Sequence, residues 1–543
     1  MESERIGNAH VADSLARPRK GASSSVRIRS GVAIDFVYRD PDEGISAQVD
    51  CRLLYMGAQL FEVRRAYAVA ISIFEGSHSR RELSKRLAES PEIQRHYESV
   101  ERNGKVCLTM REKTFREPGP LDGIEFSLRI TRGLRAHLHP LELERFAALG
   151  NLMPLLEGGR SEAEIRRTLA LRLPAEDCAW AGKLLGWLKR ENLLEADRGE
   201  GDGKWLALAR PRITFLGHST LLMQSERSAV LLDPIVTRKM GSPKMALGIF
   251  RAKLDAICCT HSHWDHCNPE TLIRLDKNVP ILIPKVPRPS ALNPPIAIML
   301  KRLGFTDIRE VEVWEPVTVG DIEIVPAPFH GEPDEPGAEI DHYTYVLRTA
   351  GMTVYGGVDS YRDNWGDMQP VLEQVEHEYR PDVVFLPVSR VVYTYRDGSL
   401  NQFCRYVDED LVGASFQYTA GPEEAAQWSL SMGAGLLVPY ATFGFTRWAD
   451  RAQVMQFGAA LKEIGAGDRF YPLRPLDSIS TPDLERAARS RARRRLLLSW
   501  HYGISGLRRL GQISGFLRAC EALLRGLRKG RRYLAKARAA AHN

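Results

Sequence analysis

The stretch CCTHSHWDHCN, residues 258–268, places three histidines and one aspartate within six positions. It continues the apolar run DAICC, which is typical of a buried strand. In an extended loop, residues two apart point to the same side, so His261 and His263 can bind one metal ion. Asp265 and His266 then point elsewhere, which suits a second ion nearby. The loop therefore predicts a metal site, provided that further ligands come from distant parts of the chain.

From Arg212 onward the chain consists of short β-type runs separated by Gly, Pro and Asp turns. Helical segments lie between several of these runs; PEEAAQWSLSMG, for example, has Pro422 in its first turn and Gly433 at its end. Strands that alternate with helices in this way form layered domains in which helices bury the sheet. The pattern predicts one α/β domain over residues 205–480.

The ligand loop and its surroundings resemble the metallo-β-lactamase superfamily, whose signature loop reads His-x-His-x-Asp-His. LGHSTLLMQSERSAVLLDPIVTRKMGSP, residues 216–243, is similar to the opening hairpin of one branch. That branch includes the N-acyl-phosphatidylethanolamine-hydrolysing phospholipase D and the L-ascorbate-6-phosphate lactonase. The resemblance implies an αβ/βα sandwich. It also implies that His218 belongs to a Gly-His-Ser/Ala-Thr turn and that Asp233 braces the ligand loop from behind.

Two later motifs extend the resemblance. VPAPFHG places His330 where the family has the third histidine of its first metal site. YGGVDSYRD places Asp359 where the family has its bridging aspartate, although the family usually reads Gly-Asp-Thr at this point. The resemblance thus implies two ligand sets, His261, His263 and His330 for the first ion and Asp265, His266 and Asp359 for the second.

The last conserved block of the branch contains a departure. The family has a terminal histidine in a phrase such as Pro-x-His-x-Gly-Thr-Phe, whereas this chain reads VPYATFGF, with Tyr440 and Ala441. The next histidine is His501. The second site has therefore lost one nitrogen ligand. Tyr440, His342 or an acid in HGEPDEPGAE could replace it, and the spacing does not distinguish between them.

The ligand types indicate what such a site can do. A metal ion with three histidines lowers the pKa of its bound water towards ~7 and supplies hydroxide at neutral pH. Asp265 could orient or deprotonate this nucleophile. Two carboxylates and one imidazole are harder ligands than three histidines and accept manganese or iron as readily as zinc. The expected cofactor is one or two divalent ions, zinc first, with manganese or iron as alternatives.

These considerations predict a metal-dependent hydrolase that cleaves an ester, lactone, amide or phosphodiester bond. Asp265, His218 and Tyr440 are its predicted catalytic residues, the last two facing the substrate. An iron-dependent redox enzyme on the same fold is a second hypothesis. A non-catalytic scaffold with a decayed second metal site is a third. The predicted substrate is a small molecule, a peptide or a lipid-like compound.

The region from 31 to 200 contains a repeat. FEGSHSRRELSKRLA (74–88) matches LEGGRSEAEIRRTLA (156–170), and each copy reads as a helix end, a Gly turn, a Ser cap and a helix with apolar residues four apart. The pattern resembles the winged-helix modules that bind leader peptides in peptide natural-product pathways. It predicts an α+β winged-helix-like region with a peptide or protein partner, and a generic helical packing region is the alternative. DNA binding is disfavoured because SEAEIRRTLA has no clean basic face.

The two ends of the chain differ in charge. Residues 1–30 are polar and lack an apolar secretory segment, so we expect them to be disordered and the protein to be cytoplasmic. Residues 484–543 contain 16 Lys or Arg and 2 Glu, interleaved with apolar residues. A basic amphipathic helical tail over residues 481–543 could contact an anionic membrane peripherally, or dock on the acidic body. Nucleic acid is a less favoured partner, since few aromatic residues are available for base stacking.

Overall fold

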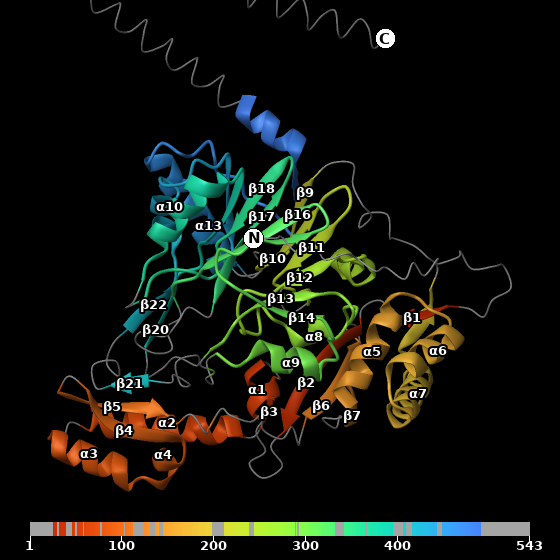
Figure 1. The fold of residues 1–543 in the computed structure, drawn as a ribbon, viewed down its shortest axis with the longest axis horizontal. Coiled ribbons are helices and arrows are strands. Elements are labelled where there is room, and N and C mark those ends of the chain that lie inside the picture. Colours follow the sequence, from red (N-terminus) through yellow and green to blue (C-terminus); the bar gives the residue numbers. More distant parts are fainter. Residues whose placement is uncertain are drawn as a thin grey trace, which may run out of the picture. The chain divides into compact units, whose positions relative to one another are not determined.

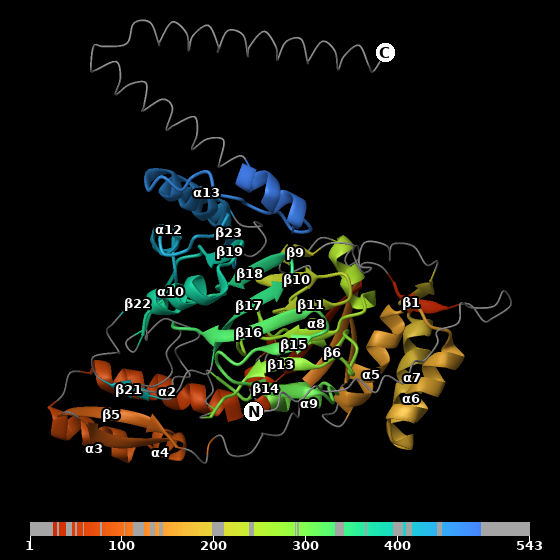
Figure 2. The same cartoon turned by 45° about the horizontal axis from the view of Figure 1, so that its top comes forward.

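The apolar runs after Arg212 form two mixed β-sheets that pack on each other (Figures 1 and 2). Gly356 of the second sheet lies against Leu232 and Leu221 of the first. The hydroxyl of Tyr345, also from the second sheet, donates to the carbonyl of Cys259 at 3.3 Å. Both contacts lie close to the predicted ligand loop, so the loop lies at the interface of the two sheets.

The computed structural model describes residues 25–489 with short gaps. The residues that it leaves undescribed within this range are 30–31, 40–45, 49–50, 58, 77–78, 103, 112–113, 115–123, 131–135, 141–144, 198–210, 238–243, 288, 290–292, 332–341, 364–365, 395–405, 409–414 and 443–447. The chain divides into two units after Thr481, and residues 482–489 of the second unit are helical. Residues 1–24, and the tail from residue 490, lie outside the described residues.

The first sheet has seven strands. Its order is β14 (Ile308–Val311), β13 (Ile281–Pro284), β12 (Ala256–Cys258), β11 (Ala229–Leu232), β10 (Thr220–Gln224), β9 (Arg212–Gly217) and β24 (Ser478–Ser480). The strands from β11 to β14 are parallel, whereas β24, β9, β10 and β11 pair antiparallel. Because β11 and β12 are parallel neighbours, the loops at their carboxyl ends emerge side by side at one edge of the sheet.

The second sheet has six strands. Its order is β15 (Val317–Val319), β16 (Ile322–Pro328), β17 (Tyr343–Thr349), β18 (Met352–Gly356), β19 (Val383–Pro387) and β23 (Leu436–Tyr440). A hydrophobic core joins its outer face to three helices, α10 (Met368–Tyr379), α12 (Pro422–Trp428) and α13 (Trp448–Glu463). The strands here are continuous apolar runs because both faces of the sheet are covered.

The predicted repeat in the N-terminal region is confirmed at the level of its helices. Helix α3 (Arg80–Glu89) starts at Ser79, whose side chain accepts from the backbone of Glu82. Helix α6 (Glu162–Arg172) starts at Ser161, which forms a complete capping box with Glu164. The apolar positions of each copy are buried, namely Leu83 and Leu87 in the first and Ile165 and Leu169 in the second.

Each copy combines helices with antiparallel strands. In the first copy, α2 (Gln59–Glu75), α3 and α4 (Pro91–His96) are followed by the hairpin of β4 (Tyr97–Arg102) and β5 (Lys105–Met110). In the second copy, α5 (Phe146–Glu157), α6 and α7 (Ala175–Arg190) are followed by β8 (Leu194–Ala196), which pairs with β1 (Val26–Ile28). The N-terminal region also contains a four-stranded sheet of β2 (Val32–Arg39), β3 (Ser46–Gln48), β6 (Ile124–Ile130) and β7 (Ala136–Pro140), in the order β3, β2, β6, β7.

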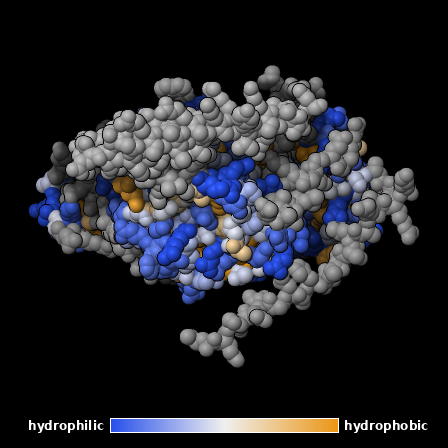
Figure 3. All heavy atoms as spheres, turned by 90° about the horizontal axis from the view of Figure 1, so that it is seen from above, coloured by the Kyte–Doolittle hydropathy of each residue, from blue (hydrophilic) through white to orange (hydrophobic). Residues whose placement is uncertain are grey.

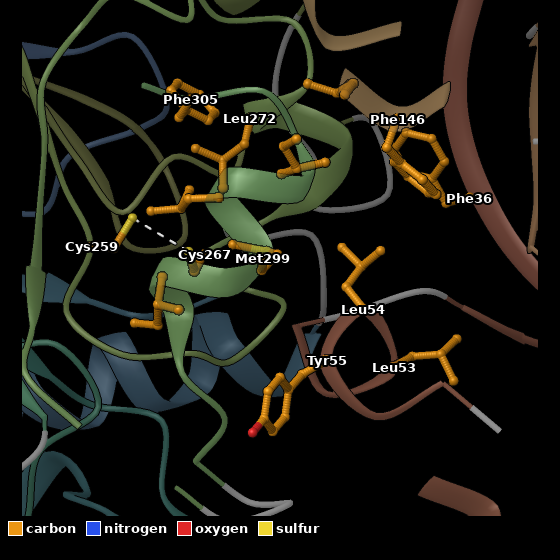
Figure 4. Close-up of a cluster of buried hydrophobic side chains, with 14 of the residues drawn as sticks. Phe36, Leu53, Leu54, Tyr55, Phe146, Cys259, Cys267, Leu272, Met299 and Phe305 are labelled. Carbon is orange, nitrogen blue, oxygen red and sulfur yellow. Dashed lines mark hydrogen bonds between the residues drawn. The ribbon is translucent and has the colours of Figure 1, made fainter. Parts of the chain in front are cut away.

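The N-terminal region and the first sheet share one hydrophobic core. Figure 4 shows Leu54 of α1 (Cys51–Met56) in the same cluster as Leu272 of α8 (Pro269–Leu272) and Met299 of α9 (Ile296–Arg302). Polar contacts reinforce this junction, because Arg302 donates to the backbone carbonyl of Leu54. A strand from the metal-site half, β21 (Tyr406–Asp408), also pairs with β5. The helical repeats are therefore built into the same unit as the two sheets.

A buried ion pair crosses the same junction. Arg274, which follows α8, donates to the carboxylate of Glu157 at the end of α5 at 2.7 Å, and both side chains are buried. The guanidinium also lies 3.9 Å from the centre of the Phe250 ring. A buried charge without a partner is costly. Any other arrangement of α5 and α8 that separated Arg274 from Glu157 while keeping them buried would therefore be less stable.

The described helices include no membrane span, and the face drawn in Figure 3 shows no large apolar patch among its described residues. Among the described residues, no helix combines the length and apolar character that a membrane span requires. On the face drawn in Figure 3, the described residues are mainly hydrophilic and the apolar ones form only small patches. The large apolar side chains that are exposed, such as Leu171, Leu430 and Met455, come from different elements.

The junction can be tested at Gly150 of α5. A Cβ atom added there would lie 2.0 Å from the carbonyl oxygen of Leu303, which is backbone and cannot rotate away. We expect Gly150→Ala to lower the free energy of unfolding by about 1–3 kcal/mol, measured by chemical denaturation. The matched control is Gly186→Ala on α7, where the nearest atom is 3.6 Å away. That change should stabilise the protein by up to ~1 kcal/mol, because Ala favours helix. Equal effects of both substitutions would contradict the close contact.

Candidate metal centre

Asp233, at the carboxyl end of β11, organises the predicted ligand loop. One of its carboxylate oxygens accepts from the backbone N–H of Thr260 at 2.8 Å. The other accepts from the Thr260 hydroxyl at 2.8 Å and from Nδ1 of His266 at 2.9 Å. The predicted bracing role of Asp233 is confirmed by these three bonds, which fix both ends of the segment that carries the ligands.

The hydrogen bonds also assign the protons on two imidazoles. The Thr260 hydroxyl gives its proton to Asp233, so it accepts from Nδ1 of His261, 2.9 Å away. Nε2 of His261 is then an unprotonated nitrogen, and it faces Nδ1 of His263 at 3.0 Å. Burial, followed by the neighbouring histidines, lowers the pKa of His261 well below its usual value. A neutral imidazole of this kind is the form that binds a metal ion.

Four side chains converge on one point beside this pair. The ligand atoms of His218, Asp265, His266 and Asp359 all lie within 4.8 Å of one another. Nε2 of His266 is 3.1 Å from Asp359, and Nε2 of His218 is 3.3 Å from Asp265. Imidazole and carboxylate groups at this density form a donor set suited to a divalent cation. Among the described residues, this is the group of metal-capable side chains that lie within that distance of one another.

The charges in this cluster are strongly coupled. Burial alone would raise the pKa of Asp265, but the hydrogen bond from His218 and the nearby His266 and His263 outweigh it and lower the pKa below its usual value. For His266, burial would lower the pKa, whereas Asp359 and Asp233 outweigh it and raise the pKa well above its usual value. Asp265 is therefore an ionised carboxylate at neutral pH, and positive charge is favoured where His266 faces Asp359.

The backbone around the cluster is strained. His218, Asp233, Val358 and Ala441 all have left-handed backbone conformations, with φ between 45° and 55°. Such conformations cost side-chain-bearing residues of order 1–3 kcal/mol and persist where the surroundings enforce them. Val358 is the most unusual, because its β-branched side chain strongly disfavours this region. It directly precedes Asp359, so the strained backbone lies in the turn after β18 that carries this predicted ligand.

His330 and His342 have different surroundings. The His330 Nδ1 lies 3.6 Å from Asp363, and its ring packs on Gly366, where an added Cβ would lie 1.8 Å from it. The ring of His342 instead lies 5.3 Å from that of His261 and 6.4 Å from that of His263, centre to centre. His342 is thus a neighbour of the predicted first-site pair. His330 as a ligand of that site stays a prediction.

Tyr440 is fully buried at the end of β23. Its hydroxyl donates to the backbone carbonyl of Ser219, and burial, followed by Asp233 and Asp359, raises its pKa well above the usual value. The next residue, Ala441, donates its N–H to the carbonyl of His218 at 3.1 Å. The segment that lacks the expected histidine therefore holds the turn that carries His218. A direct role of Tyr440 toward substrate stays a prediction.

The structure brings together three of the predicted ligands, Asp265, His266 and Asp359, and adds His218, which the sequence suggested only as a residue facing substrate. Two further polar residues lie beside predicted ligands, namely His342 next to His261 and Asp363 next to His330. The sequence predicts His342 as one of several substitute ligands for the second site, whereas in the structure its ring lies beside that of His261. Asp363 has no predicted role in the sequence analysis and is distinguished there only by its position four residues after Asp359.

Comparison with known proteins agrees with this geometry. Residues 212–413 match the family described as the β-lactamase superfamily domain. The crystal structure of CmlA, a diiron β-hydroxylase from Streptomyces venezuelae, superposes with a TM-score of 0.55 over 84% of this chain and 100% of that chain, at 14% sequence identity. At this identity the likeness shows the fold alone, and it includes the N-terminal region as well as the two sheets.

Two curated relatives match shorter segments. The 4-amino-L-phenylalanyl-[CmlP-peptidyl-carrier-protein] 3-hydroxylase of Streptomyces venezuelae is 33% identical over 126 residues, which are 22% of this chain and 24% of that protein. A UPF0173 metal-dependent hydrolase of Thermus thermophilus is 37% identical over 54 residues, or 10% of this chain and 23% of that protein. The aligned segments thus span about a quarter of each relative. The match over residues 212–413, the two mixed sheets and the His/Asp cluster together show that this part of the chain is similar to domains of the β-lactamase superfamily.

Proposed function

We propose that this protein is an iron-dependent oxygenase that hydroxylates a substrate held on a carrier protein. The sequence analysis gives an iron-dependent redox enzyme as its second hypothesis. The hydroxylation and the carrier-bound substrate are added here from the similarity to a carrier-protein hydroxylase, and this function is preferred to hydrolysis. The observation that carries it is the mixed ligand set of two imidazoles and two carboxylates within 4.8 Å. Sets of histidine and carboxylate with open positions are typical of non-haem iron sites. The 33% identity to a carrier-protein hydroxylase supports the same reaction class.

The residues fit a cation on chemical grounds. His218, Asp265, His266 and Asp359 are all buried or nearly so, with at most 16% of a side chain exposed. Carboxylate groups at this depth are costly unless a positive charge compensates them, and a divalent ion would supply that charge. His261 adds an unprotonated nitrogen at the neighbouring position. The four-residue group thus suits one ion, and the unprotonated nitrogen of His261 supports a further ion beside it.

Bound iron would supply dioxygen activation for a reaction in which a C–H bond and O₂ become a C–OH group and water, with two protons and with two electrons from an external reductant. The chain's own contribution is positional. Asp233 orients His266 and Thr260, and Thr260 fixes the tautomer of His261. Phe329 and His342 pack around His261 and exclude water from that side. Asp265 is positioned to hold or move a proton at its carboxylate, next to Nε2 of His218.

A carrier protein is the partner that this proposal requires. The N-terminal region was predicted to bind a peptide or protein, and it shares a core with the sheet that carries the ligand loop. Its first repeat also shares a sheet with β21, which comes from the metal-site half. A partner docked on the repeat would therefore rest on elements that are continuous with the site. This supports presentation of the substrate by a partner rather than capture of a free molecule.

Hydrolysis remains the second candidate. It is favoured by the 37% identity to a metal-dependent hydrolase over 54 residues. The same ligands could hold a zinc or manganese ion that supplies hydroxide. The two reactions differ in their need for dioxygen and reductant, and an experiment can separate them on that basis.

Metal content gives the first test. We expect purified protein, reconstituted anaerobically with Fe²⁺, to retain iron after desalting and to consume dioxygen when a reductant is added. His263→Ala should lose most of the iron and the dioxygen consumption, because it deletes one of the paired imidazoles. His377→Ala, on the exposed face of α10, serves as the matched control and should behave as the unmodified protein. Iron is measured by atomic emission, and dioxygen by electrode.

Retention of zinc alone, with hydrolysis of esters or lactones and no dioxygen consumption, would contradict the proposal and favour the hydrolase. No retained metal of any kind, together with no activity, would favour the non-catalytic scaffold that the sequence also suggested.

Carrier dependence gives the second test. Aminoacyl groups loaded on peptidyl carrier proteins should gain the mass of one oxygen atom when incubated with the iron-loaded protein, dioxygen and reductant. The same free amino acids should remain unchanged, because the proposal places the recognition on the carrier. Mass spectrometry of the released acyl group measures the product. Equal turnover of free and carrier-bound amino acids would overturn the carrier part of the proposal while leaving the oxygenase part intact.

A further inference from the structure

The turn between β9 and β10 places one imidazole inside the metal cluster. His218 is 1% exposed, and its Nε2 lies 3.3 Å from Asp265. Its ring meets that of His266 edge-on, with centres 5.3 Å apart. The residue has φ of 46° and follows Gly217, whose φ is 120°. The strained turn thus directs the ring inward, toward the ligands that come from the loop after β12.

Three hydrogen bonds hold this turn from two other segments. Tyr440 donates from its hydroxyl to the carbonyl of Ser219, and Ala441 donates from its backbone to the carbonyl of His218 at 3.1 Å. The hydroxyl of Ser219 in turn donates to the backbone carbonyl of Asp265 at 3.1 Å. The ring of Tyr440 is fixed by an edge contact with Phe385, 5.5 Å away. The end of β23 in the second sheet therefore fixes a turn of the first sheet against the ligand loop.

We propose that His218 is the fourth protein ligand of the second cation, beside Asp265, His266 and Asp359, and that Tyr440 positions it. The sequence indicated that this site had lost a nitrogen ligand at the end of β23. In the structure, that end carries a tyrosine and an alanine that hold the turn of an imidazole from β9–β10 instead. The ligand set becomes two imidazoles and two carboxylates, which balances the charge of one divalent ion.

An ion pair between His218 and Asp265 without a metal is the competing explanation. Together with the 3.1 Å pair of His266 and Asp359, it accounts for each contact taken singly, but it does not account for all four ligand atoms lying within 4.8 Å of one another. It also leaves two carboxylates close together in a buried place, which a cation would stabilise. The inference rests on the metal binding in the proposed function and not on the reaction.

The test measures cation binding to the full-length protein. Protein freed of metal by a chelator is titrated with Mn²⁺ in a calorimeter and with Co²⁺ in a visible spectrometer, whose ligand-field bands report the coordination at each site. His218→Gly removes the imidazole and suits the left-handed backbone, and His218→Asn keeps a polar side chain that tolerates it. We expect both variants to lose the second cation, with an affinity loss above the ~100-fold that removal of an outer partner causes.

Tyr440→Phe tests the positioning role. It keeps the ring and removes only the hydroxyl that holds Ser219, so we expect about 10-fold weaker binding of the second cation and altered Co²⁺ bands from that site. The matched control is Tyr355→Phe, a buried tyrosine of β18 whose hydroxyl donates to Thr344 at 3.2 Å. It should leave both titrations unchanged. Circular dichroism of each metal-free variant confirms that it is folded.

The outcomes for the role of His218 in cation binding can be distinguished from the outcomes for the oxygenase reaction. Unchanged binding of the second cation by folded His218→Gly would overturn His218 as a ligand, even if the protein proves to be an oxygenase. An unchanged Co²⁺ spectrum in Tyr440→Phe would overturn the positioning role. Loss of the second cation in the variants, combined with no dioxygen consumption by the unmodified protein, would support the ligand and reject the oxygenase. Failure of the unmodified protein to bind any cation would reject both.

Discussion

The site depends on the carboxylate of Asp233. It accepts three hydrogen bonds, two from Thr260 and one from His266, and these groups sit at the two ends of the segment that carries the ligands. Because β11 and β12 are parallel neighbours, the aspartate at the end of one strand reaches the loop at the end of the next. The same bonds determine which nitrogen of His261 and of His266 remains available. Position and protonation are thus set by one buried acid, before any ligand from the second sheet is added.

The fold class, the helix starts of the repeat and the bracing aspartate could be predicted from the sequence. Alternating apolar runs predicted the layered α/β fold, and the Ser79 and Ser161 caps predicted the helix starts in the N-terminal repeat. The loop motif and the resemblance predicted Asp233 as the brace. What the sequence could not give is which distant side chains meet, because spacing along the chain does not fix spacing in space. His218 and the end of β23 are more than 200 residues apart, and only the packing of the two sheets joins them.

The N-terminal region shows a similar limit. Its repeat was visible in the sequence, but its integration with the metal-site half was not, because the contacts are made by residues without a motif. Gly150, Glu157 and Arg302 are such positions. The partners of Gly150 and Glu157 lie beside α9 and α8, and Arg302 of α9 contacts Leu54 of the N-terminal region. Helices α8 and α9 cover the sheet that carries the ligand loop. The N-terminal region, which resembles a separate module in the sequence, therefore packs as part of the same unit as the metal-site sheets.

The residues with left-handed backbone conformations around the cluster affect how substitutions there change stability and metal binding. Four side-chain-bearing positions near the ligands adopt a conformation that glycine or asparagine would tolerate better. At Val358, for example, a glycine would relax the backbone and raise the stability of the fold, but it would also loosen the turn that carries Asp359. Selection for stability and selection for metal binding then act in opposite directions at such a position. Replacement by glycine there would therefore indicate a relative of this protein that no longer binds the metal.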